Sequence, residues 1–201
     1  MKNKKGLLIL AVIAIIVVIV SVFILLPRLK PPAFHGMLLQ GTSPVFDFDL
    51  TSDTDESVKL SDFRGKPVLL YFGYTFCPDV CPTTMAELGR MMRELGDDAD
   101  DVQVIMISID PERDTPERLG EYVRYFHPSF IGLTGTEDEI AQAATPLGIF
   151  YAKQEVEGAS GYLMDHTATV LLVDKDGLAR LIWPYGTSAE DMAADVRYFL
   201  P

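Results

Sequence analysis

Both cysteines of this chain lie in one short stretch, Gly73-Tyr74-Thr75-Phe76-Cys77-Pro78-Asp79-Val80-Cys81-Pro82. An apolar run, 67–72, leads into this stretch. A helical pattern follows it, because Met85, Leu88 and Met92 are spaced to share one face. The cysteines therefore lie where a buried strand becomes a helix. A thiol at a helix start faces free backbone N–H groups and the positive end of the helix dipole, which favours the thiolate.

Strand and helix patterns alternate on both sides of this stretch. Alternating or β-branched runs predict strands at 46–50, 58–60, 67–72, 102–109, 130–133, 149–154, 167–173 and 178–183. Capping residues predict helices after 81 and from 116, 137 and 189, and residues 155–162 read as a hairpin tip or loop. This order indicates an α/β fold, a mixed sheet with helices on both faces. A cysteine pair at its first strand-to-helix junction indicates a thioredoxin-like fold.

A third candidate ligand, His166, stands immediately before the predicted strand 167–173. In a thioredoxin-like arrangement, the loop entering this late strand faces the cysteine loop. Thioredoxins normally have a cis-proline at this place, in a turn that contacts the substrate. This chain has a histidine there instead, and a histidine can bind a metal. The other histidines have simpler interpretations: His35 is predicted to be a solvated linker side chain, and His127 a helix C-terminal cap.

Two thiolates and one imidazole make a soft site with three ligands. Structural zinc generally takes four protein ligands, whereas copper suits thiolate and imidazole and tolerates low or trigonal coordination. Copper is therefore the predicted metal, and both thiols must be reduced to bind it. Asp79 could add an oxygen ligand or orient the loop, and Asp165 could hold the His166 ring. A solvated Asp79 and a locally capping Asp165 are the alternatives.

The N-terminal region predicts a membrane anchor. Residues 7–26 are uncharged and, apart from Ser21, apolar. At 1.5 Å per residue, about 20 residues match a hydrocarbon core of roughly 30 Å. Three lysines precede this segment, so residues 1–6 are expected to stay in the cytoplasm. No clean small-x-small cleavage site follows, which favours an uncleaved anchor over a signal peptide.

The rest of the chain is then expected outside the cytoplasm of a bacterial cell, on the inner membrane. Residues 27–40, which contain Pro27, Pro31 and Pro32, read as a linker, and residues 41–201 as one folded domain. Outside the cytoplasm neighbouring thiols are easily oxidised. A disulfide between two such close cysteines would stabilise little, so a redox or metal role is favoured over a structural bridge.

The charge distribution excludes nucleic acid as a partner. The net charge is −12 at pH 7, yet five of the 17 basic residues precede the first acid, Asp47. All 29 acids therefore lie in the remainder of the chain. Nucleic-acid binding needs clustered Lys and Arg, which such an acidic domain lacks.

Four motifs occur in order along the chain. They are residues 72–82, residues 108–116 (Ser-Ile-Asp-Pro-Glu-Arg-Asp-Thr-Pro), residues 133–135 and residues 165–167. Together they resemble the Sco/SenC family of membrane-anchored copper proteins that assemble cytochrome c oxidase. The resemblance spans about residue 41 to the C-terminus. It implies a thioredoxin-like fold with an inserted hairpin, and Cu(I) or Cu(II) bound by Cys77, Cys81 and His166.

The same resemblance implies the binuclear copper site of oxidase subunit II as a partner, with a copper donor protein or a thiol reductant as a second. Three functions remain open: a copper chaperone, a thiol–disulfide reductase that keeps the oxidase cysteines reduced, and a copper or redox sensor. Whether the protein is an enzyme is therefore also open, with Cys77 and Cys81 as its redox pair. A thiol peroxidase is disfavoured, because Thr75 stands two residues before Cys77 rather than three.

Overall fold

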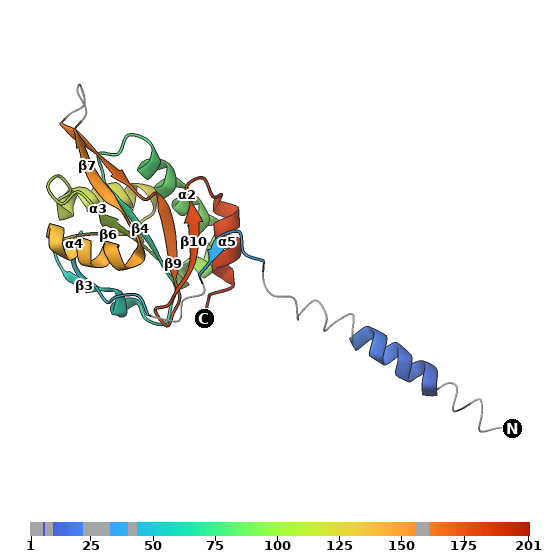
Figure 1. The fold of residues 1–201 in the computed structure, drawn as a ribbon. Helices are drawn as coiled ribbons and strands as arrows, with labels where there is room; N and C mark the ends of the chain where they lie inside the picture. Colours follow the sequence, from blue (N-terminus) through green and yellow to red (C-terminus); the bar gives the residue numbers. More distant parts are fainter. Residues whose placement is uncertain (1–5, 7–9, 22–32, 40–43, 156–160) are drawn as a thin grey trace. The chain divides into compact units, whose positions relative to one another are not determined.

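The structure, a computed structural model, describes residue 6 and residues 10–21, 33–39, 44–155 and 161–201 (Figure 1). Internal contacts divide the chain into two units, Met1–Ala33 and Phe34–Pro201. In the first unit, residues 10–21 are helical. Within the described ranges, no helix is both long enough and apolar enough to cross a membrane. The predicted anchor, 7–26, lies partly outside those ranges.

In the second unit, eight of the described strands form one mixed sheet, in the order β1-β10-β9-β4-β5-β6-β2-β3. Their bounds are β1 (Met37–Leu38), β2 (Asp49–Ser52), β3 (Ser57–Lys59), β4 (Val68–Gly73), β5 (Gln103–Ser108), β6 (Ile131–Thr134), β9 (Thr169–Val173) and β10 (Ala179–Pro184). The neighbours β4, β5 and β6 run parallel, and the other neighbouring pairs are antiparallel.

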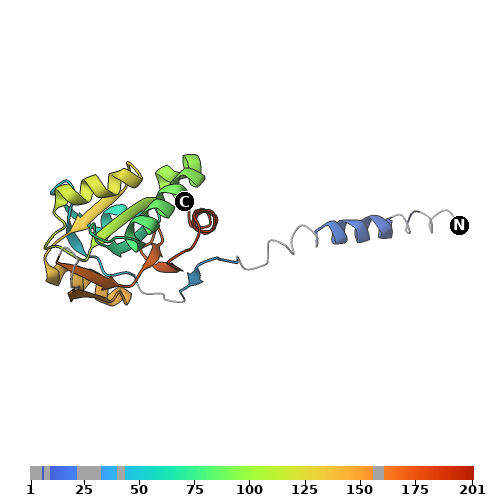
Figure 2. The same cartoon turned by 90° about the horizontal axis from the view of Figure 1, so that it is seen from above.

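Every residue of β4 and of β5 is buried. Their apolar runs lack alternation because both faces of a parallel strand pair are covered by helices. The helices are α2 (Val80–Leu95), α3 (Pro116–Phe126), α4 (Glu137–Ala144) and α5 (Ala189–Arg197). Short 3-10 segments, η1 (Leu60–Phe63), η2 (Gly96–Asp101) and η3 (Thr145–Leu147), fill three connections. Helix α2 contacts α3 and α5, and Figure 2 shows α3 and α4 on opposite sides of the sheet.

The predicted helix starts are confirmed where capping residues mark them. Thr115 accepts a hydrogen bond from the Arg118 N–H, and Pro116 is the first helical residue of α3. Thr136 and Glu139 form the capping box of α4. These caps satisfy backbone N–H groups that lack partners inside the helix.

A two-stranded hairpin, β7 (Tyr151–Glu155) and β8 (Tyr162–His166), stands apart from the large sheet (Figure 1). Residues 156–160 of the predicted hairpin tip or loop, 155–162, lie outside the described residues. The prediction that His166 stands in a loop was wrong, because strand β8 begins at Tyr162 and His166 is its last residue. The pairing of His166 with Tyr151 carries the hairpin to this point. The sequence gives little sign of β8, because its residues do not alternate between apolar and polar. In the structure, four of its five residues are half-buried.

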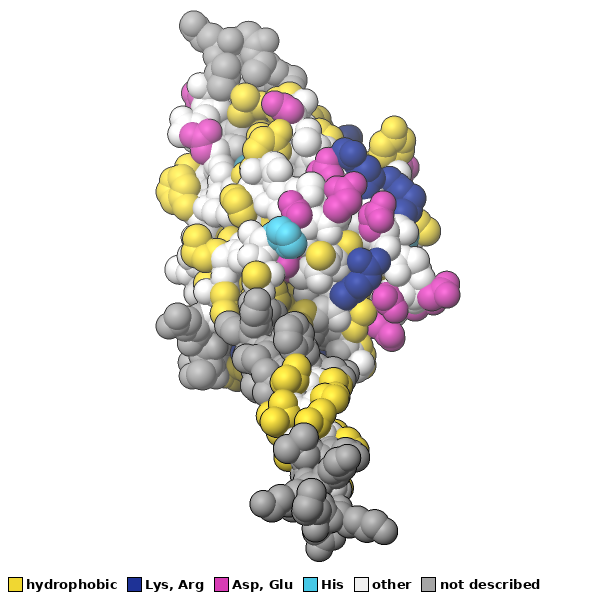
Figure 3. All heavy atoms as spheres, turned by 90° about the vertical axis from the view of Figure 1, so that its right-hand side faces the viewer, with side chains coloured by type: hydrophobic (Ala, Val, Ile, Leu, Met, Phe, Trp, Pro, Cys, Tyr) yellow, Lys and Arg dark blue, Asp and Glu magenta, His cyan; other side chains and the backbone are white. Residues whose placement is uncertain are grey.

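The folded unit also begins earlier than residue 41. Met37 and Leu38 form β1 and pair with Ile182 and Leu181 of β10. His35, predicted to be solvated, is 49% exposed, yet its Nδ1 lies 3.1 Å from Asp195 and its Nε2 3.3 Å from Asp191. The N-terminal end of this unit is therefore attached to α5. On the face shown in Figure 3, acidic and basic side chains are interspersed, as on an ordinary solvated surface.

Candidate metal centre

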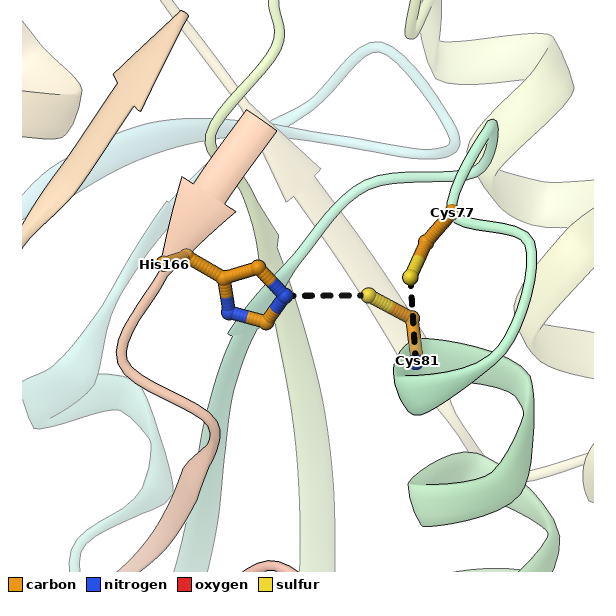
Figure 4. A group of neighbouring side chains, drawn as sticks. All are labelled: Cys77, Cys81 and His166. Atoms are coloured by element: carbon orange, nitrogen blue, oxygen red, sulfur yellow. Dashed lines mark hydrogen bonds between the residues drawn. The ribbon is translucent and has the colours of Figure 1, made fainter. Parts of the chain in front are cut away.

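The two cysteines lie at the junction of β4 and α2, as predicted. Cys77 belongs to the loop before the helix and is half-buried, whereas Cys81 lies in its first turn and is buried. The sulfur of Cys77 accepts a hydrogen bond from the Cys81 backbone N–H at 3.3 Å (Figure 4). This N–H is one of the donors at a helix start that have no intrahelical partner. Both cysteines are free thiols.

Their surroundings separate the pKa values of the two thiols. A hydrogen bond from the Cys81 side chain lowers the pKa of Cys77, and hydrogen bonds from two backbone N–H groups act in the same direction, which together outweigh the opposing effect of burial. The same hydrogen bond raises the pKa of Cys81, and burial raises it further. The pair therefore shares one proton, with the negative charge on Cys77, the more exposed sulfur.

His166 approaches the thiols from the hairpin. Its Nε2 lies 3.4 Å from the Cys81 sulfur (Figure 4). Its Nδ1 lies 3.2 Å from the Thr167 carbonyl oxygen. Because a carbonyl can only accept, the Nδ1 atom carries the proton, and the lone pair of Nε2 faces the sulfurs. One ligand atom from each of Cys77, Cys81 and His166 lies within 4.8 Å of the others.

The two acidic candidates lie at the rim. Asp79 and Asp165 are exposed and line the same depression of about 250 Å³ as Cys77 and His166, whereas Cys81 is buried behind it. Among the described residues, no hydrogen bond joins Asp165 to His166, because the Thr167 carbonyl takes its place. Asp79 stands at the N-cap position of α2 without a side-chain capping bond. Both acids therefore border the site without orienting the histidine.

Two tyrosines that the sequence analysis did not single out surround the imidazole. The rings of Tyr71 and Tyr74 are edge-on to the His166 ring, with centroids 6.2 Å and 6.0 Å away. Both tyrosines are buried. They exclude water from the inner side of the histidine and restrict its rotation. Aromatic residues in an apolar run look like ordinary core, so no sequence signal distinguished them.

A buried carboxylate supports the loop that carries Cys77. Asp114 accepts hydrogen bonds from the Thr75 backbone N–H at 3.0 Å, from the Thr75 hydroxyl at 2.6 Å and from the Ser108 hydroxyl at 2.7 Å. Burial raises the pKa of Asp114, and these hydrogen bonds oppose the increase. The loop is thereby fixed to the end of β5 two residues before the first thiol.

The donor set fits copper. Two soft sulfurs and one imidazole nitrogen suit this metal, and three protein ligands leave a position open to an exchanging partner. A closed structural zinc site requires a fourth protein ligand. Within the described ranges, these three residues are the one group of His, Cys, Asp or Glu side chains placed to hold a metal ion.

Comparisons with known proteins agree with this geometry. The SCO1/SenC family model matches residues 39–200. The mitochondrial SCO2 homolog of Bos taurus is 37% identical over 153 residues, which cover 75% of this chain and 58% of that relative. This chain thus spans less than two thirds of the length of its mitochondrial relative.

Two solved structures are similar throughout the folded unit. Copper-bound ScoI of Bradyrhizobium japonicum has 39% identity and a TM-score of 0.72, over 79% of this chain and 100% of that chain. Apo Sco1 of Thermus thermophilus has 42% identity and a TM-score of 0.75, over 84% of this chain and 98% of that chain. With its thioredoxin-like mixed sheet and separate hairpin, this chain belongs to the SCO1/SenC family.

Proposed function

We propose that this protein is a copper chaperone that helps to assemble the binuclear copper centre of cytochrome c oxidase. The observation that carries the proposal is the convergence of Cys77, Cys81 and His166 within 4.8 Å. Cys77 and Cys81 supply the sulfur ligands, and Nε2 of His166 supplies the nitrogen. Copper in the solved structure of Bradyrhizobium ScoI supports the choice of metal.

Transfer of the ion follows from the unequal exposure of the ligands. Cys77 is half-buried at the depression, whereas Cys81 is fully buried. An incoming thiolate or imidazole of the oxidase subunit reaches the copper from the Cys77 side and replaces that sulfur first. Cys81 and His166 retain the ion until a second acceptor ligand arrives. A copper donor protein loads the site by the reverse exchange.

A second candidate function is reduction of the oxidase cysteines, and the asymmetric thiol pair favours it. The Cys77 thiolate attacks one sulfur of the partner's disulfide and displaces the other as a thiolate. Cys81, after losing its proton, then attacks Cys77 and releases the partner's second thiolate. Two electrons pass to the partner and a Cys77–Cys81 disulfide forms, which a thiol reductant must reduce again. A copper or redox sensor would use the same three residues.

Copper titration of reduced and oxidised full-length protein tests the first proposal. Reduced wild type is expected to bind one copper, with a sulfur-to-copper charge-transfer band in the Cu(II) form. His166→Ala is expected to weaken binding strongly, and oxidation to abolish it. His127→Ala is the matched control, since this half-buried ring contacts Ser129 at the end of α3, away from the site. Equal affinities of wild type and His166→Ala would contradict the proposal.

Oxidase assembly in cells separates delivery from reduction. If the protein delivers copper, His166→Ala loses copper binding and oxidase assembly together. If it only reduces the acceptor, His166→Ala retains assembly, whereas Cys77→Ser and Cys81→Ser lose it. The latter pattern would reject the chaperone and favour the reductase.

We further propose that residues 7–26 anchor the protein in the inner membrane of a bacterium. Residues 1–6 then lie in the cytoplasm, and a linker joins the anchor to the folded domain on the outer side. The uncharged apolar composition of this segment and the preceding lysines support the proposal. Protease added outside spheroplasts should degrade the domain, and its protection there would contradict this orientation.

A further inference from the structure

The side chain of Arg113 connects three segments that meet beside the candidate metal centre. It comes from the connection between β5 and α3 and is 15% exposed. Its guanidinium carbon lies 3.6 Å from the centre of the Tyr162 ring, in β8, and 4.7 Å from that of Phe76, in the cysteine loop. Stacking of this kind is typical of a planar guanidinium on an aromatic face.

Polar contacts fix the orientation of the guanidinium. Its Nε donates to the Asp110 carboxylate at 2.5 Å, and one terminal nitrogen donates to the Tyr162 carbonyl oxygen at 2.9 Å. The Tyr162 hydroxyl lies 2.7 Å from the same Asp110 carboxylate. Arg113, Asp110 and Tyr162 thus form a closed ring of contacts, and Asp110 is buried.

This ring acts on the strand that ends at His166. Tyr162, Met164 and His166 are alternate residues of β8, so they turn the same side of the strand toward the cysteine loop. Arg113 binds the first of them. Met164 and Tyr74 line the same depression, and His166 faces Cys81 at 3.4 Å. Contacts along one side of β8 therefore lead from Arg113 to the ligand.

The hairpin depends on such contacts for its placement. Among the described residues, β7 and β8 pair with each other and form a two-stranded sheet apart from the large one. A lone hairpin is marginally stable and is positioned by what packs against it. The cysteines, in contrast, are fixed by α2 and by Asp114.

We propose that Arg113 is a positioning residue, which holds the hairpin so that His166 stays within ligand distance of the two thiols. The inference rests on the proposed copper binding. Loss of Arg113 weakens the histidine ligand while the thiols remain where they are. Removal of a residue that orients a metal ligand typically costs 10- to 100-fold in metal affinity, so an affinity about tenfold lower is expected.

Arg118→Gln is a matched control for Arg113→Gln. Arg118 also stacks on Phe76, with its guanidinium carbon 4.7 Å from the ring centre. It is exposed and lies in α3. Within the described part of the chain, it has no polar or cation–π contact to the hairpin. Both substitutions remove one positive charge beside the same aromatic ring.

The experiment measures Cu(I) affinity of the reduced full-length protein by competition with a chelator. Arg113→Gln is expected to bind about tenfold more weakly than wild type, and Arg118→Gln like wild type. In a His166→Ala background, Arg113→Gln should cause no further loss, because the ligand through which it acts is already absent. Equal affinities of the two arginine variants, or an equal loss in the His166→Ala background, would overturn the inference.

A second variant covers the case in which Arg113→Gln fails to fold. Tyr162→Leu removes the stacked ring but leaves Arg113 paired with Asp110. It is expected to weaken Cu(I) binding when His166 is present, and to cause no further loss in the His166→Ala background. A Tyr162→Leu variant that binds Cu(I) as tightly as wild type would overturn the inference. Failure of the proposed function is recognised separately, since wild type and His166→Ala would then bind copper equally or not at all.

Discussion

Each thiol of the candidate metal centre has its own environment. Cys77 is half-buried and receives hydrogen bonds at the start of α2, whereas Cys81 is buried beneath it. Charge on the outer sulfur and a proton on the inner one make Cys77 the atom that meets a partner first, whether that partner brings copper or a disulfide.

The lowered pKa of Cys77 predicts alkylation at unusually low pH. The thiolate is the reacting species, so a pKa below the ordinary value of 9.0 keeps Cys77 reactive as the pH falls through neutrality. Iodoacetamide should modify Cys77 in the reduced, metal-free protein with a pH midpoint well below 9.0, while Cys81 stays unmodified. Peptide mapping by mass spectrometry assigns the site, and Cys77→Ser should lose the rapid phase. A midpoint near the ordinary value would contradict the assignment of charge.

The three ligand candidates could be predicted because their chemistry is restrictive. The chain has two cysteines and three histidines, and one histidine precedes a strong buried strand. The residues around the ligands could not be predicted in the same way. Tyr71 and Tyr74 look like core, and the partner of His166 is the Thr167 carbonyl, a backbone group that no side-chain pattern reveals.

At the scale of elements, the strands that could be predicted from sequence are those that are buried on both faces of the sheet. Strands β4, β5 and β9 are apolar runs and were located within two residues of their observed bounds. Strand β8 was missed because it is half-buried and exists through its pairing with β7. His166 was predicted to lie in a loop, but this pairing makes it the last residue of a strand. The pairing thereby places its side chain beside the start of α2.

The end of β4 must remain a glycine for the same geometric reason. A Cβ atom at position 73 would lie 2.7 Å from a ring carbon of Tyr71 and 3.1 Å from the Cys81 sulfur. Gly73→Ala should therefore displace both groups and destabilise the protein by about 1–3 kcal/mol, the usual cost of overpacking. Denaturant unfolding of the metal-free protein measures the loss. Cu(I) affinity should fall as well, and wild-type values of both would show that the site accommodates the methyl group.

At the scale of the whole folded unit, a buried carboxylate of the last helix binds the segment that immediately precedes the first strand. Asp195 in α5 accepts hydrogen bonds from the Gly36 backbone N–H and the Trp183 indole, each at 2.9 Å, and from the His35 backbone N–H at 3.1 Å. These bonds explain why the unit begins before residue 41. The bonds from His35 and Gly36 could not be inferred from sequence, since they join residues about 160 positions apart.

This arrangement predicts a characteristic pH dependence of stability. Burial acts to raise the pKa of Asp195, but the hydrogen bonds outweigh burial and lower it below 3.8. A lowered pKa contributes stability above 3.8, which is lost as the pH falls through the folded-state value. Asp195→Asn should therefore destabilise the protein by about 1–3 kcal/mol at neutral pH, and the difference should shrink only below pH 4 or so.

Denaturant unfolding from neutral to acidic pH measures this difference. Asp191→Asn is the control, because its carboxylate is 45% exposed and pairs with the opposite nitrogen of the same His35 ring. It should cost little, as exposed ion pairs do. Equal effects of the two substitutions, or a difference that vanishes near neutral pH, would contradict this role of Asp195.

Copper itself should connect parts of the molecule that otherwise meet through side-chain packing. The sulfurs belong to α2 and its preceding loop, while the imidazole belongs to a hairpin outside the large sheet. Any ligand that binds the folded state alone stabilises it, by about 2.7 kcal/mol at a hundredfold excess over Kd. A raised Tm therefore cannot distinguish a site with two ligands from one with three. Local amide hydrogen exchange can, because protection rises where the metal restrains opening.

In reduced wild type, Cu(I) should slow exchange both at 77–81 and across β8. In His166→Ala, any remaining copper bound by the thiols should protect 77–81 alone, since nothing then connects the ion to the hairpin. His127→Ala should behave like wild type. Protection confined to the helix start in wild type would mean that His166 is not a ligand, whatever the rise in Tm. Protection of β8 that persists in His166→Ala would mean that the hairpin is restrained by contacts other than the metal.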